Sequence, residues 1–463
     1  MLESSEMKAE MSTREVDYQL TDQNGVIKAE SLDAGALFVL ESKGTWLHAG
    51  FHLTTSIVAP ALLSLPFAFA SLGWAAGIIC LTVGAAVTFY SYNLMSMVLE
   101  DLERQGKRQL RFRDVSYQVM GPRWARFLIG PIQFLVCYGA VVGCTLLGGQ
   151  TLKFIYIIYH PDGSMKLYEF VICFGGLMLI LGQMPSFHSL RHINLVSFIL
   201  CLAYSLCAVV GSIHAGHKKG SEKDYSLVGS TTSKVFAALN AFSIIATTYG
   251  NGIIPEIQAT LAPPVSGKMF KGLCVCYSVV MSTFFSVAIS GYWAFGNKAA
   301  GTIYSNFVPL DRPALLPNWF LFMSNMFVLL QLSAVALVYL QPAFEVLERQ
   351  SADVKMGRFS VRNLVPRLIL RTLTIVIATL VAAMLPFFGD INAVIGAFGF
   401  LPLDFVLPMV CYNLTFKPSK RSIIFWANIT IAVIFSMMSI VGCVAAVRQI
   451  SLDADSYKLF ANV

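Results

Sequence analysis

Two short segments, far apart in the chain, combine helix-breaking residues with side-chain hydroxyls. The first, residues 52–66, places two Thr and a Ser ahead of Pro60. The second, residues 247–256, holds two Thr, two Gly and Pro255. A proline within a helix removes a backbone N–H and displaces the preceding turn, so backbone groups near residue 56 lose their partners. Such freed backbone groups and hydroxyls can bind a polar ligand without a buried counter-charge.

Three ionisable side chains lie close to these segments or in similarly apolar sequence. Glu256 directly follows Pro255, His52 precedes Pro60 by two turns, and Asp404 stands between two prolines. Ionisable groups within long apolar runs are rare and commonly carry protons or ions. We therefore predict Glu256 as the first proton-coupling candidate, His52 as the second and Asp404 as a third. An alternative for Asp404 is a cap on a kinked helix near the cytosolic surface.

The composition of the chain indicates that membrane-spanning helices hold these residues. Of the 463 residues, 56% are hydrophobic and only 13% are charged, whereas soluble domains carry about 25% charged residues. The net charge of +7 is spread over short loops, which does not indicate a nucleic-acid partner. The chain is predicted to be a polytopic, all-α integral membrane protein in contact with lipid, and a soluble enzyme is excluded.

Apolar run lengths and loop charges predict the topology. A bilayer core requires about 20 apolar residues per helix. With the N-terminus in the cytosol, the predicted inner segments hold 22 Lys and Arg and the outer ones 9, which favours a cytosolic tail at 1–45 and an extracellular tail at 448–463. The eleven predicted spans are 46–71, 75–99, 127–158, 168–184, 193–214, 234–257, 272–295, 318–341, 366–386, 391–412 and 422–447.

The helix-breaking segments fall in spans one and six. These spans occupy corresponding positions in two five-helix halves, at about 46–214 and 234–412, which leaves 422–447 as an extra helix. Interrupted helices at corresponding positions mark the binding site of inverted-repeat transporters. The alternative is a pair of ordinary proline-kinked helices, which are common in membrane proteins.

Long uninterrupted strings of the chain have the sequence of a known family. They are LHAGFHLTTSIV (47–58), LLSLPFAF (62–69), SIIATTYGNGIIPEIQATLAPP (243–264), AAMLPFFGDINAVIGAFGF (382–400) and PLDFVLP (402–408). These strings resemble the amino acid/auxin permease family of the amino acid–polyamine–organocation superfamily, and within it the branch of plant GABA transporters. The resemblance covers about residue 38 to the C-terminus.

The resemblance implies a LeuT-type 5+5 inverted repeat with one extra C-terminal helix. It also implies proton-driven import at the plasma membrane. A zwitterion such as GABA needs donors for its carboxylate, for which we expect the exposed backbone at Ile57, Val58, Ala59 and Ala61. Its ammonium needs acceptors, for which we expect Ser243, Thr247 and Thr248. Tyr249 would close over the ligand or offer a cation–π face. The alternative for the Ser and Thr hydroxyls is that they only bond to the backbone of their own helix.

The predicted function is import of GABA, and of related amino acids, coupled to protons by alternating access. Sodium coupling is the rival, but residues 42–99 contain no Asp or Glu, and sodium sites often use a carboxylate. Further alternatives are a permease for proline or general amino acids, and a transporter-derived sensor or channel. We expect no cofactor beyond the coupling proton, no metal, no enzymatic activity and no obligate protein partner.

Overall fold

The computed structural model describes residues 19–21, 27–29, 42, 44–160, 163–183, 191–217, 223–308, 314–353, 356, 359–385, 388–454 and 460. Most of the predicted N-terminal tail (1–45) and part of the predicted C-terminal tail (448–463) lie outside these residues. Within the first tail, β1 (Gln19–Thr21) and β2 (Ile27–Ala29) pair antiparallel. Every other regular element of the described residues is a helix.

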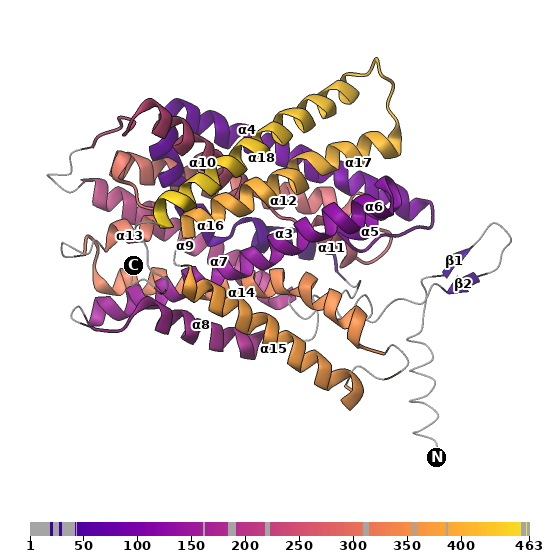
Figure 1. The fold of residues 1–463 in the computed structure, drawn as a ribbon, viewed down its shortest axis with the longest axis horizontal. Helices are drawn as coiled ribbons and strands as arrows, with labels where there is room; N and C mark the ends of the chain where they lie inside the picture. Colours follow the sequence, from indigo (N-terminus) through magenta and orange to yellow (C-terminus); the bar gives the residue numbers. More distant parts are fainter. Residues whose placement is uncertain are drawn as a thin grey trace.

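The helices run side by side along the length of the molecule (Figure 1). The labels α and η distinguish α-helices from 3-10 and π segments. In chain order they are α3 (Trp46–Ile57), η1 (Pro60–Ser64), α4 (Leu65–Arg104), α5 (Phe112–Met120), α6 (Pro122–Trp124), η2 (Ala125–Ile129), α7 (Gly130–Tyr159), α8 (Leu167–Leu181), α9 (Arg191–His217), α10 (Thr231–Tyr249), α11 (Ile254–Ala259), α12 (Lys268–Phe295), η4 (Gly296–Lys298), α13 (Ile303–Phe307), α14 (Asn318–Ser351), α15 (Val361–Met384), α16 (Phe388–Val394), η5 (Ile395–Val406), α17 (Leu407–Phe416) and α18 (Ile423–Ala454).

Eight stretches of the described residues are long and apolar enough to cross a membrane. The first, Trp46–Arg104, joins α3, η1 and α4, where the sequence predicted two spans. Gly73 in α4 has a φ of 78° and lies between those two predictions. Helix α8 is apolar but has only 15 residues. Apart from the β1–β2 pair in the N-terminal tail, the described residues confirm the helical membrane class, and the total of eleven spans stays a prediction.

The surface of the bundle is apolar and its interior holds polar groups. Phe127, Ile180 and Ile423 are each at least 75% exposed, as expected where lipid covers the outside. Arg371 is 1% exposed, and its guanidinium lies 3.2 Å from a Glu348 carboxylate oxygen. Buried charges are paired in this way because leaving one unpaired is costly.

Two helices lose regular geometry in the middle of the bundle. Helix α3 ends at Ile57, Ala59 is extended with φ −84° and ψ 159°, and the 3-10 turn η1 begins at Pro60. Helix α10 ends at Tyr249, and α11 begins only at Ile254. We call residues 58–59 the first gap and residues 250–253 the second gap. Gly252 in the second gap has a φ of 65°, a conformation that glycine adopts without strain. The backbone groups in both gaps need partners other than the next turn of helix.

The tenth predicted span, 391–412, contains a feature that the sequence analysis did not predict. Between α16 and α17 the chain forms the 12-residue π-helix η5, with Pro402 inside it. π segments are rare and occur often at functional sites. The wider turns direct the buried side chains of Phe400 and Asp404 towards the second gap, as the contacts below show.

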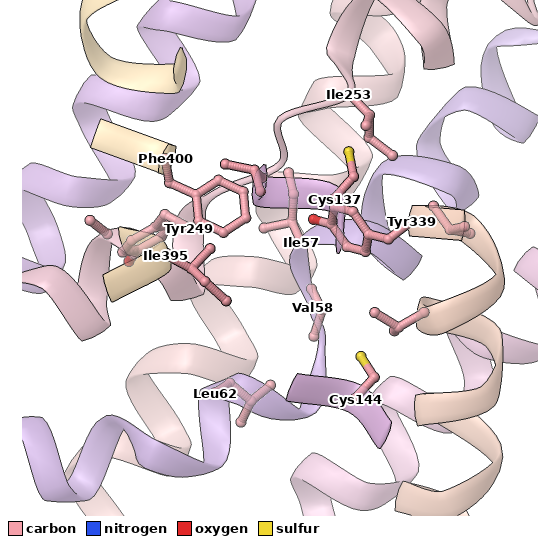
Figure 2. Close-up of a cluster of buried hydrophobic side chains, with 14 of the residues drawn as sticks. Ile57, Val58, Leu62, Cys137, Cys144, Tyr249, Ile253, Tyr339, Ile395 and Phe400 are labelled. Carbon is pink, nitrogen blue, oxygen red and sulfur yellow. The ribbon is translucent and has the colours of Figure 1, made fainter. Parts of the chain in front are cut away.

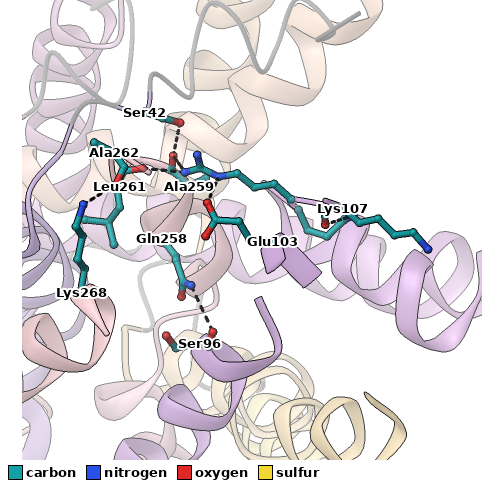
Figure 3. A network of polar contacts seen from close by, with 11 residues as sticks. Ser42, Ser96, Glu103, Lys107, Gln258, Ala259, Leu261, Ala262 and Lys268 are labelled. Carbon is teal, nitrogen blue, oxygen red and sulfur yellow. Dashed lines mark hydrogen bonds and ion pairs between the residues drawn. The ribbon is translucent and has the colours of Figure 1, made fainter. Parts of the chain in front are cut away.

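The chain just before α3 is tied to the end of α11. Gly44 N–H donates to the Thr260 carbonyl at 2.7 Å, and Ala262 N–H donates to the Gly44 carbonyl at 2.9 Å. Ser42 Oγ donates to the Ala259 carbonyl at 2.6 Å, and Lys268 Nζ donates to the Ala262 carbonyl at 2.8 Å (Figure 3). The entrance to the first interrupted helix and the exit of the second therefore share one hydrogen-bonded junction.

Candidate functional site

A cavity lies where the two gaps meet. Its volume, counted as the space open to the centres of water molecules, is about 50 Å³, which is room for several of them. Residues of α3, η1, α7, α10, α14, α16 and η5 line it, and none of them carries a charge. The lining includes Ser56, Ile57, Ala59, Pro60, Ala61, Cys144, Thr247, Thr248, Gly250, Tyr339, Asn392 and Phe400.

The residues predicted to bind substrate around the end of α3 lie at the cavity, with one exception. Ile57, Ala59 and Ala61 line it. Val58 is fully buried and outside the lining, and its carbonyl accepts hydrogen bonds from Tyr204 Oη at 3.1 Å and Gln331 Nε2 at 3.3 Å. Figure 2 shows Ile57 at the end of α3 and Val58 on the short link that follows it, with Phe400 and Tyr339 on opposite sides.

The predicted residues of α10 divide into two groups. Thr247 and Thr248 line the cavity, whereas Ser243 and Tyr249 do not. Ser243 Oγ donates to the Leu239 carbonyl within the helix at 3.1 Å. Tyr249 Oη donates to the Leu81 carbonyl at 2.8 Å, so its ring is held against α4 and does not cover the cavity in this conformation.

A polar network joins the two gaps beside the cavity. Asn251 Nδ2 donates to Ser56 Oγ at 2.6 Å, which links one gap directly to the other. Asp404 accepts the backbone N–H groups of Asn251 at 2.9 Å and Gly252 at 3.1 Å. Asp404 is fully buried. Its carboxylate caps the backbone of the second gap, because no regular turn satisfies those N–H groups.

Glu256 faces a second cavity, of about 40 Å³, which Arg111, Gln133 and Glu345 also line. Its Oε1 accepts from Phe112 N–H at 3.0 Å and from Gln133 Nε2 at 2.6 Å. Its Oε2 is buried and has no hydrogen-bond partner among the described residues. Gln133 Nε2 also donates to the Gly252 carbonyl at 3.2 Å, so one amide connects the carboxylate to the second gap.

His52 lies in α3 and lines neither cavity. It is 3% exposed, and its backbone carbonyl accepts Ser56 Oγ at 3.1 Å. The three proton-coupling candidates thus occupy separate places: a second cavity, the second gap and the body of α3. Their roles stay predictions.

Three amide side chains escaped the sequence analysis. Asn251 and Gln133 hold the network, and Asn392 lines the cavity. Each stands within a predicted span, where uncharged polar side chains often bond across helices. Asn and Gln within apolar runs are therefore a sequence signal for such contacts, alongside hydroxyls and ionisable groups.

Interrupted helices around an uncharged cavity, inside a bundle of apolar helices, are typical of secondary transporters. Comparison with known proteins agrees with this class. The chain belongs to the transmembrane amino acid transporter family, whose sequence model matches residues 42–451. This membership makes the protein a multi-pass transporter and not an enzyme.

Two proteins of Arabidopsis thaliana illustrate the relationship. The chain is 60% identical to GABA transporter 1 over 436 residues, which cover 94% of this chain and 97% of the relative. It is 30% identical to lysine histidine transporter-like 1 over 422 residues, which cover 90% of each. The expected resemblance to the amino acid/auxin permeases is therefore confirmed.

Solved structures show the same fold at low identity. MhsT, crystallised in complex with L-phenylalanine, superposes with a TM-score of 0.55 at 9% identity, covering 88% of this chain and 99% of MhsT. A Na⁺-coupled sialic acid symporter, in a substrate-bound outward-open state, gives a TM-score of 0.51 at 13% identity, covering 94% of each. These likenesses establish the LeuT-type fold.

Enlarging Ala59 should block the cavity. Ala59→Leu adds a branched side chain to the extended link that lines it, and the free space is only a few water volumes. We expect uptake to fall at least about tenfold while surface expression, measured by an external epitope tag, stays near normal. Full transport by this variant would place the substrate elsewhere.

Proposed function

We propose that this protein imports GABA together with protons across the plasma membrane by alternating access. The observation that carries the proposal is the uncharged cavity between two interrupted helices. It is supported by 60% identity to GABA transporter 1. The proposal includes no cofactor beyond the coupling proton and no obligate protein partner.

The cavity suits a small zwitterion. A zwitterion has no net charge, so a lining without charged side chains can hold it with dipoles alone. The apolar residues Leu147, Leu332 and Ile395 also line the space and would contact a methylene chain. A cationic or anionic amino acid would leave one buried charge without compensation, which is unfavourable.

For coupling, we propose that Glu256 carries the proton. The second cavity gives its carboxyl a place to exchange a proton away from the substrate, and Gln133 links that carboxyl to the Gly252 carbonyl in the second gap. Charged or titratable groups around it are Arg111 and Arg113, Glu345 and Cys137. The first cavity, by contrast, has no carboxylate in its lining that would favour sodium there.

We also propose the full architecture predicted from the sequence. It comprises two inverted five-helix repeats, at about 46–214 and 234–412, followed by the extra helix. In the structure that last helix, α18, continues to Ala454, seven residues beyond the predicted 447. The N-terminus would lie in the cytosol and the C-terminus outside, following the distribution of Lys and Arg.

Uptake of radiolabelled GABA in oocytes tests the proposal. We expect saturable uptake with an inward current, enhanced by acidic external medium and unaffected when choline replaces sodium. A panel of unlabelled proline, β-alanine and α-amino acids then ranks the substrates. Loss of uptake without sodium would refute proton coupling, and an ohmic conductance or no flux would instead support a channel or a sensor.

A further inference from the structure

The hydroxyl groups that line the first cavity already donate their hydrogen atoms to the protein backbone. The accepting carbonyls are those of Leu53 for Ser56 at 3.0 Å, Asn392 for Thr247 at 2.6 Å, Ile244 for Thr248 at 2.9 Å and Ser56 for Tyr339 at 3.3 Å. A hydroxyl has one hydrogen to give and two lone pairs. These four groups therefore face a ligand as hydrogen-bond acceptors.

The amide of Asn392 is different. The residue is 5% exposed and lines the cavity, and its amide nitrogen is buried without a hydrogen-bond partner among the described residues. An amide nitrogen carries two hydrogens, and a buried donor without an acceptor is costly unless a ligand, water or ion serves as its partner. The Cys144 thiol in the same lining is only a weak donor. Asn392 thus supplies the strong side-chain donor of this cavity.

Resting on the proposed function, we propose that Asn392 is a substrate-binding residue whose amide nitrogen donates a hydrogen bond to the carboxylate of the substrate. An ionised carboxylate only accepts hydrogen bonds, and an ammonium only donates them. The amide therefore matches the carboxylate, and the hydroxyl oxygens match the ammonium. A hydrogen bond to an ionised partner is stronger than a neutral one, so this amide recognises the carboxylate without a buried cation.

The cavity places an acceptor across from this donor. Asn392 and Ile395 are three residues apart at the junction of α16 and η5, and both line the cavity. Figure 2 shows Ile395 and Tyr339 on opposite sides of Val58. Tyr339 Oη keeps its lone pairs for an ammonium, and its ring offers a cation–π face. A linear zwitterion would then extend from α16, with its carboxylate, to α14, with its ammonium.

Two substitutions at Asn392 test which atom meets the substrate. Asn392→Leu has a similar size but no donor, and we expect KM for GABA to rise about tenfold or more, as for loss of a hydrogen bond to a charged group. Asn392→Asp keeps the shape but sets a carboxylate against that of the substrate, so KM should rise at least as far. Surface expression is measured in parallel with an external epitope tag.

The preference for GABA over its carboxamide provides a readout that a structural role would not move. Competition against radiolabelled GABA uptake gives an inhibition constant for each compound. The wild type should prefer GABA, because the carboxamide offers the amide nitrogen only a neutral acceptor. This preference should fall several-fold in Asn392→Leu. In Asn392→Asp it should fall about tenfold or more, because the new charge repels the carboxylate alone.

A buried asparagine elsewhere in the bundle provides the matched control. Asn325 in α14 lies outside both linings, and its amide nitrogen donates to the Leu321 carbonyl of its own helix at 2.8 Å. Asn325→Leu should keep the wild-type KM and the wild-type preference at equal surface level.

Two results would overturn the inference. Wild-type KM and preference in Asn392→Leu would show that the amide does not contact the substrate. Near-normal KM for GABA in Asn392→Asp would show that the side chain accepts from the ammonium instead. If the wild type fails to import GABA, the proposed function fails by itself, and the same variants are then compared on the amino acid that the panel identifies and on its carboxamide.

Discussion

Replacing Glu256 by Gln should abolish accumulation of substrate while leaving exchange across the membrane intact. The substitution keeps the size of the side chain and leaves an oxygen to accept from Phe112 N–H and Gln133 Nε2. It removes the ability to bind and release a proton. The cavity that we propose for substrate has a separate lining, so binding should survive.

The size of the expected loss follows from the driving forces. One pH unit contributes about 1.4 kcal/mol per proton, and one charge crossing 100 mV adds about 2.3 kcal/mol. Together they support roughly two to three orders of magnitude of accumulation. Uncoupled exchange supports none.

Proteoliposomes with an imposed pH gradient measure both activities. Wild-type protein should concentrate GABA, and Glu256→Gln should equilibrate it while retaining counterflow. Glu169→Gln, at an exposed carboxylate that caps α8 by accepting from Lys166 N–H at 2.6 Å, should behave as wild type. Undiminished, pH-dependent accumulation by Glu256→Gln would make Glu256 structural and His52 the next candidate.

Asp404→Ala should impair folding and transport together. Its carboxylate accepts the N–H groups of Asn251 and Gly252, and each buried donor left unpaired costs about 1–3 kcal/mol. The second gap would then lose its fixed geometry, and Thr247 and Thr248 beside it would no longer face the cavity in a defined way. We expect a clear fall in melting temperature in detergent and loss of uptake.

A graded series makes this result specific. Asp404→Asn retains one acceptor oxygen, so it should lie between wild type and Asp404→Ala. Asp101→Ala removes a carboxylate that accepts from Gln105 Nε2 on the surface of α4, and should cost no more than about 0.5 kcal/mol. A wild-type melting temperature for Asp404→Ala would contradict the role assigned to the carboxylate.

Local chemistry predicted a good part of this arrangement. Pro60 and the Gly250–Pro255 segment mark where helical geometry ends, because a missing N–H and glycine backbone act on their own turns. Runs of about 20 apolar residues predicted the helical membrane class. Helix breaks and apolar runs are both properties of short stretches, so they can be recognised in a single sequence.

Properties that depend on packing could not be predicted in this way. Tyr249 follows Thr248 in an apolar helix, and only the position of α4 decides that its hydroxyl meets Leu81. Asp404 stands between two prolines in the sequence, but only the packing of the π-helix places its carboxylate against the second gap. The register between α10 and η5 is tertiary information, and so is the presence of Asn392 in the cavity.

The hydrogen bond from Asn251 Nδ2 to Ser56 Oγ makes the evolution of one interrupted helix depend on the other. A change of Ser56 to an apolar residue strands the Asn251 amide, so its cost depends on which residue stands at 251. The two positions are therefore epistatic: each restricts the mutations that the other tolerates. Engineering of substrate preference at the link between α3 and η1 will accordingly succeed more often when residues 56 and 251 are randomised as a pair.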